Sequence, residues 1–191
     1  EPMDFVPADA IQFSRWRLDL KRLWSSLETM VNQITPGGLA GLVGALEQAT
    51  RQRDPGFSFR DSILANLGDD IASYAKAPRG TSLIELSDQP TINLIRSPNS
   101  DRLLESIRTL VQSASALSPM FSLEFKEREF LGKKIYSVRL PDMSSAEGEA
   151  VPQRALQLSS GNGYLAMTTD EAILEEFLRS GESKPRPLAG T

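Results

Sequence analysis

The chain has 191 residues, of which 40% are hydrophobic and 24% are charged, and its formal net charge is −4. This balance is ordinary for one folded domain, and it indicates neither a disordered segment nor a nucleic-acid surface. The chain has no histidine and no cysteine, which excludes imidazole bases, thiol nucleophiles, disulfides and the zinc sites built from these side chains. Any catalysis would rest on carboxylates, lysine, tyrosine, serine or a metal held by oxygen ligands.

The first third of the chain is predicted to form one strand and two helices. The strand covers Ala10–Arg17, although its alternation of apolar and polar side chains is imperfect. Residues 18–34 carry apolar side chains at helical spacing, and Pro36 with the two glycines after it ends this helix. A second helix is predicted from Leu39 to about Arg51.

Small residues recur every four positions around the start of the second helix, at Gly37, Gly41 and Ala45. This spacing lets another helix approach closely, and in a membrane it indicates dimerisation. The apolar run 37–46 is too short to span a membrane. We therefore expect this face of the helix to pack closely inside a soluble core.

The stretch from Phe57 to Pro78 is predicted to join the helical part of the chain to a part rich in strands. We expect a short helix, a stop at Gly68, and a strand that begins near Ile71. Gly68→Val is therefore expected to damage folding, whereas Asp70→Ala is expected to have little effect.

The second half of the chain alternates short strands with two further helices. The first of these helices starts at Ser97-Pro98-Asn99 and ends before Pro119, and Thr168 with Glu171 suits a capping box for the last one. Strands are predicted at 81–86, 91–96, 120–125, 134–140, 154–159 and 163–168, and helices at 99–115 and 170–179. Residues 141–152 are predicted to form a loop.

This order of elements predicts an α+β fold, with an antiparallel or mixed sheet and helices packed mainly on one face. We expect residues 1–179 to form a single domain excised from a longer protein, and 180–191 to form a flexible tail or linker. No transmembrane segment is expected in this piece, because no apolar run is long enough to span a bilayer.

Asp69 and Asp70 are the candidate metal ligands, because adjacent carboxylates suit a hard cation such as Mg²⁺ or Ca²⁺. Neighbouring residues of a strand point to opposite faces, so the two side chains converge only if the backbone bends. The favoured alternative is a solvated turn after a glycine that ends a helix. No catalytic residue, cofactor-binding residue or cofactor is predicted.

Two further motifs match known patterns only in part. Gly161-x-Gly163-x-x-Ala166 has the spacing of a dinucleotide fingerprint, but no helix opens directly after it, so we interpret it as a hairpin turn. Ser73-x-x-Lys76 matches the serine–lysine pair of penicillin-binding enzymes. That pair meets in a helix, whereas in a strand the two side chains face opposite ways.

Aromatic side chains could line an apolar ligand site between the helices and the sheet, although such residues more often form the core. Arg15 and Arg17 could contact an acidic partner, although a solvated face is the favoured interpretation. The aromatic set is Trp16, Trp24, Phe57, Phe59, Tyr74, Phe121 and Tyr136.

Two segments together resemble a group of uncharacterised bacterial proteins that carry a domain of unknown function, found in planctomycete-type and related genomes. The first runs from Phe5-Val6-Pro7-Ala8-Asp9-Ala10 through Trp24, and the second is 57–74. The strands at Gly132-Lys133-Lys134-Ile135-Tyr136 and Gly163-Tyr164-Leu165, with the closing helix, are similar to that group as well. The resemblance implies one domain of a long, exported, envelope-associated protein, in the periplasm or cell envelope, and it carries over no catalytic residue.

Three functional hypotheses follow. The first is a non-enzymatic binding or scaffolding domain of an exported bacterial protein. It would contact another envelope protein through the sheet face, or through a groove between the sheet and the helices at 18–34 and 99–115. The second is a hydrolase or oxygen-ligated metal site at Asp69 and Asp70. The third is a carrier of an apolar small molecule. The hypotheses differ in the pocket that they predict. A binding domain needs no pocket with converging polar groups, a hydrolase or metal site needs a pocket with converging carboxylates, and a carrier needs a large apolar cavity.

Overall fold

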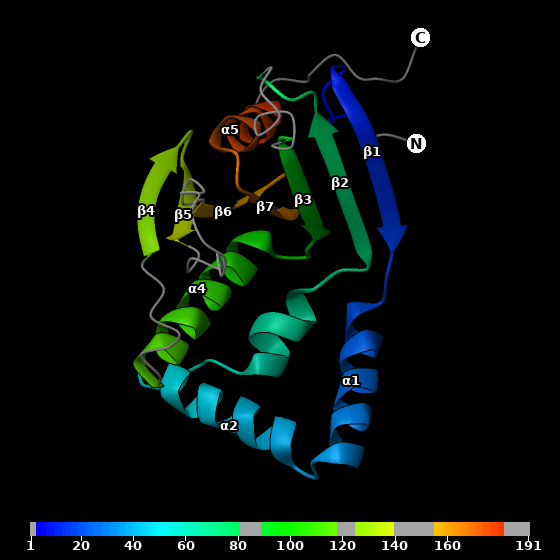
Figure 1. Cartoon of the computed structure of the whole chain (residues 1–191). Helices are drawn as coiled ribbons and strands as arrows, with labels where there is room; N and C mark the ends of the chain where they lie inside the picture. Colours follow the sequence, from blue (N-terminus) through cyan, green and yellow to red (C-terminus); the bar gives the residue numbers. More distant parts are fainter. Residues whose placement is uncertain (1–2, 81–88, 118–124, 140–154, 182–191) are drawn as a thin grey trace, which may run out of the picture.

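The computed structural model describes residues 3–80, 89–117, 125–139 and 155–181 (Figure 1). The predicted strand at 81–86, most of that at 120–125, the loop at 141–152 and nearly all of the tail at 180–191 lie outside these ranges. The elements in chain order are β1 (Ala10–Arg17), α1 (Leu20–Ile34), α2 (Gly38–Arg51), the short helical turns η1 (Phe59–Ile63) and η2 (Leu64–Asn66), β2 (Asp70–Lys76), β3 (Thr91–Arg96), α4 (Ser100–Leu117), β4 (Phe125–Phe130), β5 (Lys133–Arg139), β6 (Ala155–Gly161), β7 (Tyr164–Thr168) and α5 (Glu171–Ser180).

The strands form one seven-stranded sheet in the order β1-β2-β3-β7-β6-β5-β4. Every neighbouring pair is antiparallel. The predicted α+β class is therefore confirmed, and the sheet is antiparallel rather than mixed. The pairing of β3 with β7 joins the N-terminal strands to the C-terminal strands.

The sheet has a hydrophobic core on each face. Adjacent residues of a strand point to opposite faces, and Tyr164 and Leu165 of β7 belong to different clusters of buried side chains. The cluster that contains Tyr164 also holds four buried residues of α5, whereas the cluster that contains Leu165 holds Leu103 and Leu104 of α4 and residues of η1. α5 therefore covers one face of the sheet, and α4 with η1 covers the other.

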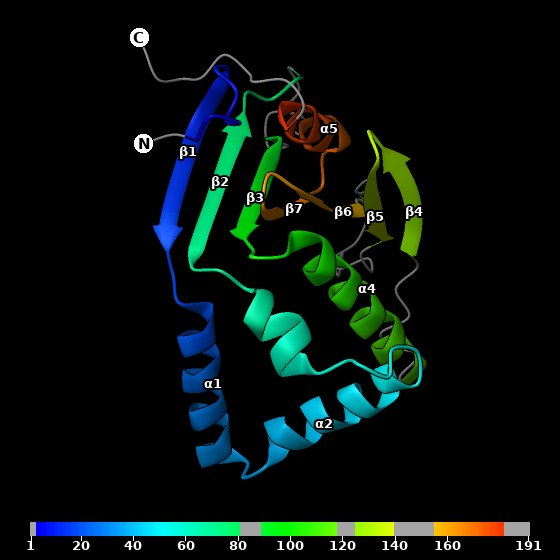
Figure 2. The ribbon, with the colours of Figure 1, turned by 180° about the vertical axis from the view of Figure 1, so that it is seen from behind.

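α1 and α2 form an arm that extends away from the sheet. α1 continues beyond the end of β1, and α2 runs from the foot of α1 to the far end of α4 (Figures 1 and 2). No residue of α1 is buried, and the only buried residue of α2 is Thr50 at its last turn. We call α1 and α2 together the arm. Among the described residues, no helix is both long enough and apolar enough to cross a membrane.

The expected close packing of the small residues in the arm is wrong. A Cβ atom built on Gly37 or Gly41 would meet no atom of the described residues within 4 Å. Gly37 instead has a left-handed backbone, with φ of 74°, at the tight link between α1 and α2. Gly41 therefore lies on an open face of the helix, and Gly37 supplies the left-handed backbone that the link requires.

The stretch 57–78 forms the predicted joint between the arm and the sheet. η1 and η2 lie between α2 and β2, and the Gly68 N–H donates to the Arg96 carbonyl of β3 at 2.7 Å. A Cβ at residue 68 would lie 2.6 Å from that same carbonyl oxygen. Glycine is therefore required here for the close approach of two backbones.

The hairpin turn between β6 and β7 and the cap of α5 complete the fold. Asn162 and Gly163 both have positive φ, as a two-residue hairpin turn between β6 and β7 requires, so the structure shows the expected hairpin rather than a dinucleotide loop. The predicted capping box is wrong, because Asp170 caps α5 by accepting from the Ile173 N–H at 2.9 Å. The Thr168 hydroxyl donates to the Thr91 carbonyl of β3 instead.

Candidate binding site

Asp69 and Asp70 lie in different surroundings. Asp70 is the first residue of β2 and is 8% exposed, and its two carboxylate oxygens accept from the Arg15 guanidinium at 2.8 Å each. The Tyr164 hydroxyl also donates to Asp70, at 2.7 Å. Asp69 is exposed, and its backbone oxygen accepts from the Leu18 N–H. No group of three or more histidine, cysteine or acidic side chains in the described part of the chain is placed to hold a metal ion.

The surroundings of Asp70 stabilise its charged form. The hydrogen bonds from Arg15 hold the pKa of the Asp70 carboxyl below its usual value, against the opposing effect of burial, and the bond from Tyr164 acts in the same direction as Arg15. The expected solvated turn at Asp70 is therefore wrong. Asp70 instead ties β1, β2 and β7 together at the start of the sheet.

Lys76, the lysine of the serine–lysine pattern, also takes part in structural contacts. The Lys76 amine contacts Asp9 at 2.9 Å and Glu176 at 2.5 Å, and so links β2 to α5. Ser73 is a neighbour of Ala72 and Tyr74, both of which point into the core beneath α5, so its side chain lies on the opposite face from Lys76. The two side chains are therefore not brought together.

The aromatic side chains predicted to line a ligand site lie in three different places. Tyr74 belongs to the core under α5, and Phe57 and Tyr136 belong to the core under α4. Trp16 is 55% exposed on the edge strand β1. Trp24 and Phe59 are therefore the two members of the set that line a cavity, and Phe121 lies outside the described residues.

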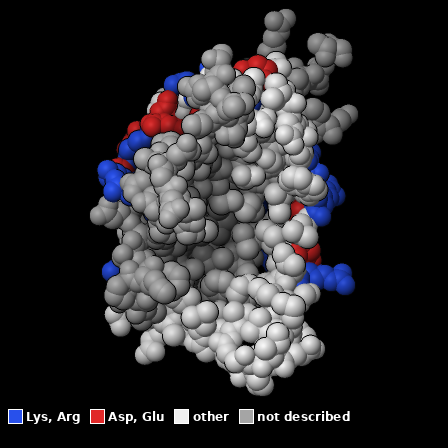
Figure 3. All heavy atoms as spheres, viewed as in Figure 1, with Lys and Arg blue, Asp and Glu red and all other residues white. Residues whose placement is uncertain are grey.

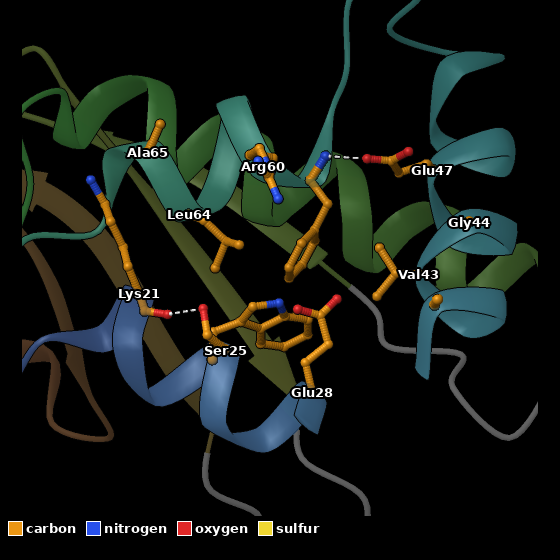
Figure 4. A pocket seen from close by; sticks show the side chains of 12 residues that line it. Lys21, Ser25, Glu28, Val43, Gly44, Glu47, Arg60, Leu64 and Ala65 are labelled. Carbon is orange, nitrogen blue, oxygen red and sulfur yellow. Dashed lines mark hydrogen bonds between the residues drawn. The ribbon is translucent and has the colours of Figure 1, made fainter. Parts of the chain in front are cut away.

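That cavity has a volume of about 560 Å³ and lies between α1, α2 and the η1–η2 segment (Figure 4). The volume is within the range of small-molecule sites, roughly 300–1,000 Å³. Trp24 and Phe59 pack against each other with ring centroids 4.8 Å apart and planes tilted by 45°. Further apolar lining comes from Ala40, Val43, Leu64 and Ala65.

One of the charged residues around the cavity is fixed by the fold. Glu47 of α2 accepts from the Phe59 N–H at 2.6 Å, and its other oxygen lies 3.4 Å from Arg51. Arg51 in turn donates to the Phe57 carbonyl at 2.9 Å. These bonds hold η1 against α2, so Glu47 supports the cavity wall.

Lys21 and Arg60 also line the cavity, and they are not engaged in this way. Neither side chain forms a hydrogen bond or an ion pair with the described residues. Lys21 extends from the first turn of α1 towards the segment that carries Ala65, and Arg60 lies on the wall that faces α1 (Figure 4). Glu28 is seven residues beyond Lys21, about 10 Å further along the helix axis. The lining of the cavity therefore combines apolar side chains with the cations Lys21 and Arg60 and the carboxylates Glu28 and Glu47.

A second surface feature is the uncovered apolar side of the arm. Of the nine large hydrophobic residues exposed in the described part of the chain, eight lie between residues 11 and 42. Five of them form what we call the apolar flank: Leu23, Leu27, Met30, Ile34 and Leu42, which are 51%, 39%, 54%, 78% and 58% exposed. Residues 29–46 contain no charged side chain. Figure 3 accordingly shows an uncharged lower end, where Figure 1 places the link between α1 and α2.

The apolar flank exists because the apolar stripe of α1 is wider than the surface that covers it. Successive residues of a helix are about 100° apart, so Trp24 and Val31 lie on one side of the stripe and Leu27 and Ile34 on the other. Trp24 and Val31 are half-buried, whereas the opposite side faces solvent. Helical periodicity identifies such a stripe, but it gives no indication of which side a neighbour covers.

A smaller cavity of about 290 Å³, lined by Asp101, Glu105, Lys133 and Lys134 among others, lies at the start of α4. Its charges neutralise one another: Lys133 contacts Asp101 at 3.2 Å, and Lys134 contacts Glu105 at 3.4 Å. The Ser160 hydroxyl donates to Asp101, and the Tyr136 hydroxyl donates to Glu105 at 2.5 Å. This cluster is a closed network of partners and leaves no charge for a ligand.

The cavity between α1, α2 and η1 was not predicted from the sequence. Trp24 and Phe59 were identified as candidate lining residues, but Lys21, Arg60 and Glu28 were not. The lysine and the glutamate are spaced at helical intervals from Trp24, which is consistent with a common face of α1. Arg60 comes from a turn whose position relative to α1 depends on the tertiary fold. Comparison of the chain with protein-family models, curated proteins and solved structures found no match, so its resemblance to exported bacterial proteins stays a prediction.

Proposed function

We propose that this protein is a non-enzymatic binding domain of an exported bacterial protein, and that the apolar flank of the arm is its contact surface for a protein partner. The resemblance to envelope-associated proteins supports a partner in the cell envelope. The observation that carries the proposal is the concentration of exposed apolar side chains on one projection of the domain, in which residues 29–46 carry no charge. Soluble proteins rarely expose such a patch without an interaction to cover it.

The composition and shape of the arm suit this role. Complete burial of a large apolar side chain contributes about 1.5–3 kcal/mol, so covering five half-exposed ones provides a contribution of about 1 kcal/mol each. The residues at the centre of protein interfaces are typically apolar and free of charge. The apolar flank shares both properties, and α1 and α2 hold it clear of the sheet (Figure 2).

The hydrolase alternative gains no support from the geometry. Asp70 is bonded to Arg15 and Tyr164, and neither Asp69 nor Asp70 lines the cavity between α1, α2 and η1. The candidate nucleophile Ser73 and the amine of Lys76 lie on opposite faces of β2. A further serine that bonds a carboxylate, Ser160, belongs to the closed network at the start of α4.

Site-specific photo-crosslinking in the native cells tests the proposal. A photoreactive phenylalanine analogue at Leu27 or Ile34 is expected to yield one product of defined mass. The matched control places the same analogue at Thr29, an exposed residue on the opposite side of α1. Adding Leu23→Gln and Met30→Gln to the Ile34 probe is expected to lower the yield several-fold, because the partner loses apolar contacts.

Two results would contradict the proposal. One is the absence of a specific product at both probe positions. The other is the same set of products at Thr29 as at Ile34, because contact would then not depend on the apolar flank.

A further inference from the structure

We propose that the cavity between α1, α2 and η1 binds an amphiphilic monocarboxylate, a molecule with one anionic head group and an apolar body. This inference is independent of the proposed protein contact, because the cavity and the apolar flank lie on different sides of α1. It also differs from a carrier of purely apolar molecules, since charged side chains line part of the cavity.

The head group is assigned from the cations that the described residues leave unpaired. Many of the cations in the described residues pair with a carboxylate, as Arg15, Lys76, Arg128 and Lys133 do. Lys21 and Arg60 line one cavity and pair with none of the described carboxylates. Lys21 supplies an ammonium and Arg60 a guanidinium to the lining of the same cavity, and a charge-assisted bond from either of them to a carboxylate is among the stronger hydrogen bonds.

The apolar body is assigned from the apolar lining of the cavity. The Trp24 and Phe59 rings line the cavity and pack against each other, and the Val43 and Leu64 side chains extend into it (Figure 4). A chain of methylene groups seated there leaves water and contacts aromatic and aliphatic carbon, which favours binding by about 0.8 kcal/mol for each buried methylene.

Glu28 sets the direction of the ligand and limits its charge. It lines the cavity about two turns of α1 beyond Lys21. An anionic group at that end would meet a like charge, which disfavours binding. A dicarboxylate of similar length is therefore expected to bind more weakly than a monocarboxylate.

Tryptophan fluorescence tests the inference directly, because the chain has two tryptophans and one of them lies in the cavity. Trp16→Phe removes the exposed one and leaves Trp24 as the reporter. Titration of this variant with decanoate is expected to give a saturable change in emission. Decanol, which lacks the anionic head group, tests the role of that group, and the dicarboxylate sebacate tests the far end of the cavity. Each is expected to bind at least several-fold more weakly than decanoate.

The role of the cations is tested by Lys21→Gln and Arg60→Gln in the same background. Each is expected to weaken decanoate binding about tenfold, the size expected for one charge-assisted hydrogen bond in a partly open site. Arg22→Gln is the matched control, because it removes the same charge from the neighbouring residue, which does not line the cavity. It is expected to leave the affinity within about twofold, and circular dichroism of each variant verifies the fold.

Three results would overturn the inference. The first is no saturable response of Trp24 to decanoate. The second is equal affinity for decanol, which would mean that the cavity does not recognise the head group. The third is an equal effect of Lys21→Gln and Arg22→Gln, which would reduce the role of Lys21 to general surface charge. None of these results bears on the protein contact of the apolar flank.

Discussion

At the scale of single residues, Asp70 shows how a surface-like sequence feature can become part of the core. An acidic pair directly after a glycine suggests a solvated turn, and Asp69 is indeed exposed. Asp70 is instead enclosed by Arg15 from the neighbouring strand and by Tyr164 from a strand 94 positions further along the chain. Strand alternation predicts that Asp69 and Asp70 diverge, but it gives no indication of these long-range partners.

Asp70→Asn is expected to destabilise the domain by about 2 kcal/mol at neutral pH, because Arg15 loses its charged partner in a partly buried site. The pKa of Asp70 is lowered in the folded state. Its charge therefore stabilises the fold above the unfolded pKa of about 4, and this contribution is lost as the pH falls below that value. Urea unfolding at pH 7 and pH 3 measures both effects, and the variant is expected to approach the wild type at the lower pH.

Asp69→Asn is the matched control for this experiment. Because Asp69 is exposed, its substitution is expected to change the free energy of unfolding by no more than about 0.5 kcal/mol. A loss in Asp70→Asn that is equal at both pH values, or no larger than that in Asp69→Asn, would contradict the assigned role of the ion pair.

All three tyrosines of the chain are expected to titrate above the usual pH. Burial, followed by the hydrogen bond to Glu105, raises the pKa of Tyr136 to about 12. Burial also raises the pKa values of Tyr74 and Tyr164. The neutral phenols thus stabilise the fold up to about pH 10, and this contribution is lost as the pH rises further.

Ultraviolet absorbance measures this titration. The native protein is expected to show little phenolate at pH 10, whereas the protein in urea is expected to be half-ionised near that pH. A native phenol that is half-ionised at pH 10 would contradict the burial assigned to these side chains.

At the scale of elements, the joint at Gly68 provides a sharp test. Gly68→Val is expected to destabilise the domain by about 3 kcal/mol or more, because its Cβ would lie 2.6 Å from the Arg96 carbonyl oxygen and the backbones must separate. The control is Gly41→Val in α2, where the same change meets open space and improves helix propensity slightly. Chemical denaturation that ranks Gly41→Val as the more damaging change would contradict the assigned geometry.

The sequence allows most element boundaries to be predicted, because periodicity and turn residues act locally. β1 and β3 have the bounds expected from alternation and turns, and α1 and α2 start within about two residues of their predicted starts. The cap of α5 was mispredicted, because two polar residues compete for that position and the Thr168 hydroxyl is engaged by Thr91.

At the scale of the whole molecule, the sequence does not predict the order of the strands in the sheet or which faces of the helices are covered. Local patterns do not specify that β3 pairs with β7, because that contact joins segments 76 positions apart at Ile92 and Thr168. In the same way, helical periodicity predicts the apolar stripe of α1, whereas the partial exposure of that stripe depends on where α2 and η1 end. The arm and the cavity beneath it are therefore features of the tertiary fold.

The central claim is that the apolar flank is available for binding because it contributes little to folding. Urea denaturation of Leu23→Gln/Met30→Gln/Ile34→Gln against Trp24→Gln measures this directly, since glutamine retains good helix propensity. The triple variant is expected to keep the free energy of unfolding of the wild type within about 1 kcal/mol, whereas Trp24→Gln, on the covered side of the same helix, is expected to lose about 2 kcal/mol. A triple variant that loses as much stability as Trp24→Gln would show that the flank is part of the folded core, and would contradict the claim.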